Sequence, residues 1–161
     1  MRKKSQIGQV FIYLISTLII MLVLYFGYNA IKNIGKKQQE ISFVTFKNRL
    51  TDMITYTSSD YGTVRVENFD VPAGFTEVCI VDPSLIVTKD SSKISDNYPI
   101  IKDSVADGAM ANVFLLPAGS PFYIEKVFIE TDSKYICFPV VQGKVKIRIE
   151  GMGDRAKLSS P

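Results

Sequence analysis

The feature that most limits the fold of this sequence is an uncharged run of 27 residues from Ser5 to Ile31, made mostly of Ile, Leu, Val, Phe, Met and Tyr. A helix of that length is about 40 Å long, which is enough to cross a hydrocarbon core about 30 Å thick. We therefore predict a single transmembrane helix over 6–31, surrounded by membrane lipid. A secretory signal peptide has a shorter apolar stretch that is followed by a small-residue cleavage site, and this run does not fit that pattern.

The charges are divided unevenly around this run. Three of the 19 Lys and Arg residues precede it, and the remaining 16 match the 16 Asp and Glu residues, which all follow it. The part after the run is formally neutral, so we expect no nucleic acid partner. Positive charge is greater by about one at the N-terminal end of the run once the α-amino group is counted, which predicts a cytoplasmic N-terminus and an extracellular C-terminal domain.

The chain contains no histidine. This excludes Ser-His-Asp and Cys-His nucleophilic catalysis and histidine-containing zinc sites. No other motif points to a reaction, so we expect no enzymatic activity, no catalytic residue, no metal site and no cofactor.

Two cysteines, Cys79 and Cys137, each lie inside an apolar run. They are either buried free thiols or the two halves of one disulfide across the core. A disulfide needs an oxidising compartment, so the expected extracellular location favours the bridge.

The first 13 residues combine a very short basic leader, a small residue followed by Gln, and an apolar helix that begins at once. This N-terminus resembles the class III signal peptide of archaeal type IV pilin-like proteins. The resemblance implies cleavage between Ser5 and Gln6, or as a second choice between Gly8 and Gln9. It also implies that the apolar helix is retained and self-associates in a filament core.

One position departs from the pilin pattern. Many pilins carry Glu five residues into the mature chain, whereas this sequence has Val10 or Tyr13 there, depending on the cleavage junction. The alternative is a non-polymerising single-pass envelope protein whose β-domain binds a ligand or a protein partner. The identity of any such ligand is left open.

Beyond the run, the sequence predicts a helical stem and then a β-rich domain. No proline occurs over 32–57, and apolar residues recur there at roughly helical spacing. The predicted fold is therefore α+β: a basic leader (1–5), a transmembrane helix (6–31), a helical stem (32–57) and an antiparallel β-sandwich-like domain (58–161).

Within 58–161, apolar and β-branched segments separated by Pro, Gly and Asp predict short strands and no second helix. We predict a long polar loop over 89–107 and a hairpin about Gln142-Gly143. The predicted strands cover 63–67, 76–81, 85–88, 112–116, 122–130, 135–141 and 144–150.

Three cations alternate with apolar residues in the last of these strands. Lys144, Lys146 and Arg148 should share one face of it. This face is either a basic surface patch for acidic polysaccharide, lipid headgroups or a neighbouring subunit, or an ordinary solvated face. Alternation of this kind is common in half-buried strands, which favours the solvated face.

Overall fold

A computed structural model describes the chain over residues 4–161, with side chains described at 10–32 and 38–161. The chain divides into two units, one ending at Ile41 and the other spanning Ser42–Pro161. The predicted α+β class, the N-terminal apolar helix and the antiparallel sheets are confirmed. Residues 1–3 of the predicted leader lie outside the described residues.

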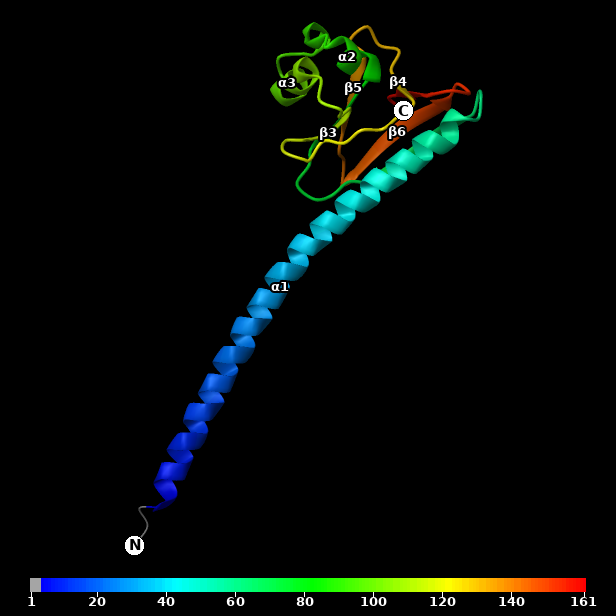
Figure 1. The fold of residues 1–161 in the computed structure, drawn as a ribbon. Helices are drawn as coiled ribbons and strands as arrows, with labels where there is room; N and C mark the ends of the chain where they lie inside the picture. The colour runs from blue at the N-terminus through cyan, green and yellow to red at the C-terminus, as the bar shows by residue number, and fades with distance from the viewer. Residues whose placement is uncertain (1–3) are drawn as a thin grey trace. The chain divides into compact units, whose positions relative to one another are not determined.

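Helix α1 spans Lys4–Ser58 and contributes to both units (Figure 1). It contains no proline, and the absence of a helix breaker allows it to continue past the apolar run. It ends where Ser58 donates from Oγ to the Thr55 carbonyl, at 2.7 Å, and a turn follows. Gly62 lies in that turn with a φ of 77°, a conformation that glycine adopts without steric cost.

The second unit contains two sheets and two further α-helices (Figure 1). The four-stranded sheet has the order β1-β6-β7-β4, and the three-stranded sheet has the order β3-β2-β5. Every paired strand is antiparallel to its neighbour except for the parallel pair of β4 and β7. The elements are β1 (Val64–Asp70), β2 (Glu77–Val81), α2 (Pro83–Thr88), η1 (Ser91–Lys93), α3 (Pro99–Asp107), β3 (Val113–Leu116), β4 (Val127–Phe128), β5 (Tyr135–Pro139), β6 (Lys144–Gly151) and β7 (Ala156–Ser159).

The main core of this unit joins the end of α1 to both sheets. Phe46, Leu50 and Ile54 recur every four residues, so they lie on one face of α1, and all three are buried. They belong to one cluster with inward residues of both sheets, and the rings of Phe46 and Phe69 meet edge to face at 6.5 Å. The last part of α1 is therefore a core element of the second unit.

The three-stranded sheet is also covered on its other face. Side chains alternate along β2, so that Val78 and Ile80 belong to the α1 core, whereas Cys79 and Val81 belong to a second cluster. Helix α2 adds Leu85 and Ile86 to this second cluster, and α3 adds Ile101 and Val105. Strand β2 is buried on both faces for this reason, which explains its continuous apolar sequence.

Two helices occupy the region that the sequence predicts as a strand and a loop. The predicted strand over 85–88 is wrong, because Asp82 caps a helix there by accepting a hydrogen bond from the Ser84 amide at 2.9 Å. The predicted loop over 89–107 is also wrong in part, because it contains η1 and α3. Both α-helices begin at a proline, which is favoured in the first turn.

The predicted hairpin about Gln142-Gly143 is wrong in its pairing. The tight turn forms, with φ of 52° at Gln142 and 72° at Gly143, and the Val141 amide donates to the Lys144 carbonyl at 2.8 Å. Strand β5 before the turn nevertheless pairs with β2, whereas β6 after it pairs with β1 and β7. The turn thus carries the chain from one sheet to the other.

Gly151, at the end of β6, allows the sheet to approach the end of α1 closely. A Cβ atom at this position would lie 2.1 Å from the Thr57 carbonyl oxygen and 2.2 Å from the Asp60 carbonyl oxygen. Backbone hydrogen bonds fix this approach, because Gly151 donates to Thr63 at 2.9 Å and accepts from Gly62 at 2.8 Å. No side chain larger than hydrogen fits here without a backbone shift.

We predict that Gly151→Ala lowers the free energy of unfolding of the second unit by about 3 kcal/mol, because the added methyl group must displace backbone atoms. Thermal and denaturant unfolding of the full chain in detergent would measure this loss. Gly27→Ala is the matched control, since a Cβ at Gly27 meets no atom within 4 Å. Equal stability of the Gly151→Ala variant and the parent would contradict the packing described here.

Candidate functional site

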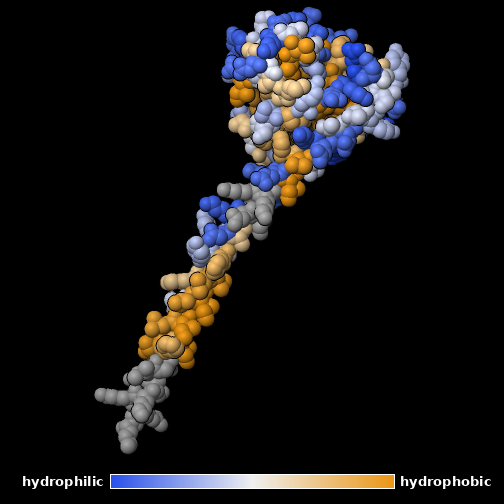
Figure 2. All heavy atoms as spheres, in the orientation of Figure 1, coloured by the Kyte–Doolittle hydropathy of each residue, from blue (hydrophilic) through white to orange (hydrophobic). Residues whose placement is uncertain are grey.

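The apolar part of α1 is exposed along its whole described length. The segment Val10–Lys32 has 23 residues with a mean hydropathy of 2.5, and none of it is buried within the chain. Figure 2 shows hydrophobic residues gathered along this part of the helix. Exposed apolar surface of this size is unfavourable in water. By length and composition, this helix could therefore span a membrane or serve as a signal segment.

Two hydroxyl side chains within this segment, those of Ser16 and Thr17, are satisfied by the helix itself. Ser16 donates to the Ile12 carbonyl and Thr17 donates to the Tyr13 carbonyl, each at 2.8 Å. Hydroxyls bonded in this way need no water or partner, so they cost little in an apolar environment.

The predicted cleavage junctions lie in the first turns of α1. Ser5, Gln6, Gly8 and Gln9 have helical backbone, and their side chains lie outside the described residues. The cleavage of either junction stays a prediction from the sequence.

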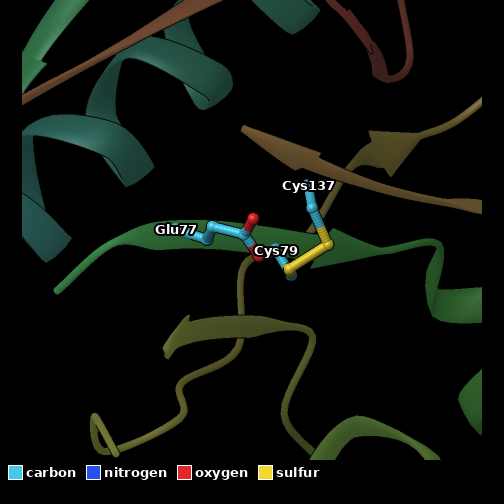
Figure 3. Close-up of side chains that lie close together, drawn as sticks. All are labelled: Glu77, Cys79 and Cys137. Atoms are coloured by element: carbon cyan, nitrogen blue, oxygen red, sulfur yellow. A yellow bond between two sulfur atoms is a disulfide. The ribbon is translucent and has the colours of Figure 1, made fainter. Parts of the chain in front are cut away.

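Cys79 and Cys137 form a disulfide between neighbouring strands (Figure 3). They are directly opposite each other on β2 and β5, with their Cα atoms 4.0 Å apart. The Glu77 carboxylate lies within 4.8 Å of both sulfur atoms, so the three groups have the proximity of metal ligands. The sulfur atoms are bonded to each other, however, and a metal would need them as thiolates. The cluster is therefore a structural bridge.

Glu77 has a partner of its own beside this bridge. Its Oε2 atom accepts a hydrogen bond from the Tyr98 hydroxyl at 3.3 Å. Burial and the negative charge of Glu77 together raise the pKa of the Tyr98 hydroxyl above its usual value. Tyr98 thus stays protonated and holds the start of α3 against β2.

Lys144, Lys146 and Arg148 share the outer face of the four-stranded sheet. The residues that alternate with them in β6, Val145, Ile147 and Ile149, are buried on the opposite face. Two of these cations have acidic neighbours. Lys144 lies 3.6 Å from an Asp70 carboxylate oxygen, and Arg148 lies 3.8 Å from a Glu150 carboxylate oxygen. Two of the three cations thus have an acid beside them, which favours a solvated face over a site for a polyanion.

A hollow with a volume of about 600 Å³ opens on the second unit. It lies between α1 and β1, and its lining includes Met53, Tyr56 and Arg65. No sequence motif marks this hollow, so it was not predicted. The hollow is lined by polar residues of α1, including Asn48 and Asp52, that lie next to the buried stripe of Phe46, Leu50 and Ile54. This polar stripe is the only sign of the hollow that the sequence of α1 contains.

A smaller hollow of about 320 Å³ includes Asp82, which is buried. Its carboxylate accepts one hydrogen bond from Ser84 and another from the Ile129 amide, at 3.1 Å. Both oxygen atoms are thus used to hold α2 against the chain after β4. We assign Asp82 a structural role for this reason.

No protein-family model, curated protein or solved structure matches this chain.

We predict that replacing both cysteines by serine lowers the free energy of unfolding of the second unit by about 2–4 kcal/mol, because the bridge closes a loop between residues 58 positions apart. Thermal unfolding of the oxidised full chain would measure the loss. A reductant should bring the parent chain down to the same stability and leave the double variant unchanged. A parent chain whose stability is insensitive to reductant would contradict this prediction.

Proposed function

We propose that this chain is a membrane-anchored structural subunit of the type IV pilin-like kind, which assembles through its N-terminal apolar helix and displays the second unit outside the cell. The observation that carries the proposal is the continuity of α1. One helix contains both the exposed apolar segment Val10–Lys32 and the stripe that is buried in the core of the second unit. Helical backbone therefore joins the exposed apolar segment to the folded domain.

Assembly in this proposal depends on packing between apolar helices. Lipid tails are as apolar as the side chains of the segment, so helix association in a membrane is driven by van der Waals contacts and lipid release rather than by the hydrophobic effect. The self-satisfied hydroxyls of Ser16 and Thr17 allow such packing without the burial of unpaired polar groups. The partners would therefore be membrane lipid and further copies of this chain.

The second unit has the role of a display domain in this proposal. Its two sheets share one core cluster, in keeping with a sandwich-like domain on a helical stem. A disulfide between β2 and β5 suits an oxidising compartment outside the cell. The orientation with a cytoplasmic N-terminus, a non-enzymatic role and the absence of a nucleic acid partner complete the proposal.

The intact mass of the protein purified from its native membrane tests the proposal. We expect the loss of residues 1–5, or of residues 1–8, because a class III signal peptide is cut before the apolar helix. We also expect the processed chain to leave the membrane in large assemblies when it is extracted in a mild detergent. A chain that keeps its leader, apart from Met1, and is extracted as a monomer would point instead to the non-polymerising envelope protein.

A further inference from the structure

We propose that the free edge of β1 pairs in an antiparallel manner with β1 of a second copy of this chain. Strand β1 is at the end of the four-stranded sheet, with β6 as its neighbour on one side. Its seven residues, Val64–Asp70, contain no proline, the residue that commonly blocks sheet edges. This inference does not rest on the proposed function.

The backbone of β1 has unpaired groups along this edge. The Thr63 carbonyl accepts from Gly151, and the Val71 amide donates to Gly143 at 2.8 Å, so the odd-numbered residues of the strand bond to β6. Alternation then directs the amide and carbonyl groups of Val64, Val66 and Asn68 to the open side. No described residue bonds to them there. Such an edge is a template for another strand.

Two charged side chains of β1 have no ion-pair partner within the described part of the chain. Arg65 and Glu67 are half-buried and lie on the face of the sheet that α1 covers. The Arg65 guanidinium lies 5.2 Å from the centre of the Tyr56 ring, and its buried Nε finds no acceptor among the described residues. Each of these charges would gain from an opposite charge across the edge.

These charges select one pairing register. With Val66 opposite Val66 of the second copy, each Arg65 lies opposite Glu67 of the other copy, and this register also pairs the backbone groups that are free. Moving the centre of pairing to residue 67 would place two carboxylates together, and moving it to residue 65 would place two guanidinium groups together. Inward-facing charges on an edge strand usually repel a partner, whereas here they attract one in a single register.

The hollow of about 600 Å³ beside β1 has the position that this pairing needs. It lies on the α1 side of the edge, where Arg65 and Glu67 of the second copy would enter, and it is lined by Met53, Tyr56 and Asp52. An added strand would therefore meet open space there. A twofold axis relates the two copies, so each copy fills the hollow of the other.

This contact differs from packing between apolar helices. Phe46 lies beside Phe69 and Tyr56 beside Arg65, so α1 and β1 run in opposite directions within the second unit. Antiparallel pairing of β1 makes the two α1 portions over 42–58 antiparallel as well. This pairing is therefore distinct from the same-sense packing of apolar helices in the proposed function, and it describes an association of chains outside that assembly.

Single cysteines test the register in the full chain in detergent. Val66→Cys should be joined into dimers by a thiol crosslinker spanning less than about 8 Å, because the two copies of residue 66 are opposite each other, about 5.5 Å apart. Val64→Cys is the matched control, since Val64 and Val66 have nearly equal exposure, 46% and 47%, and lie on the same face. The two copies of residue 64 would be about 14 Å apart. Equal crosslinking of the two variants would overturn the proposal, as would crosslinking of Val64→Cys alone.

Charge reversal supplies an independent measurement by analytical ultracentrifugation. Arg65→Glu alone and Glu67→Arg alone should each weaken pairing by at least about tenfold, because two attractive pairs become repulsive. A mixture of the two variants should recover the pair, since the carboxylate introduced at position 65 of one variant then lies opposite the guanidinium introduced at position 67 of the other. Unfolding curves that match the parent would show that the fold is kept. A mixture that pairs no better than either variant alone would overturn the proposal.

Discussion

The packing of Phe46, Leu50 and Ile54 against both sheets is the contact on which the second unit depends. Full burial of each such side chain is worth about 1.5–3 kcal/mol, so these residues contribute a large share of a marginal stability. The contact also requires a close approach, which Gly151 permits at the end of β6. A helix that is exposed and apolar at one end thus becomes a core element at its other end.

The sequence predicts the elements whose signal is local, and it fails where tertiary packing decides. The uncharged run and the apolar stripe after it identify α1, and alternation identifies most of β1 and β6. Ile101 and Val105, by contrast, are buried one helical turn apart within a polar segment, and this weak pattern did not reveal α3. Strand β7 forms because β6 and β4 flank it, a condition that no local pattern in 156–159 records.

The candidate sites show the same division. The alternation of Lys144, Lys146 and Arg148 places them on one face, but their acidic neighbours Asp70 and Glu150 become evident only once strands are paired. The free edge of β1 is likewise a property of strand order, since every strand has unpaired groups until its neighbours are known. The candidate sites of this chain therefore depend on strand pairing and exposure, and sequence motifs do not mark them.

The continuity of α1 has a mechanical consequence. A flexible linker between an anchor and a domain stretches before the domain bears any load. Here the exposed apolar segment and the residues that fill the core belong to one helix. Because α1 lies alongside β1 in the opposite direction, tension along the helix acts as shear on the contacts of Phe46, Leu50 and Ile54, all of them at once. Load on this part of α1 would therefore reach the core of the second unit.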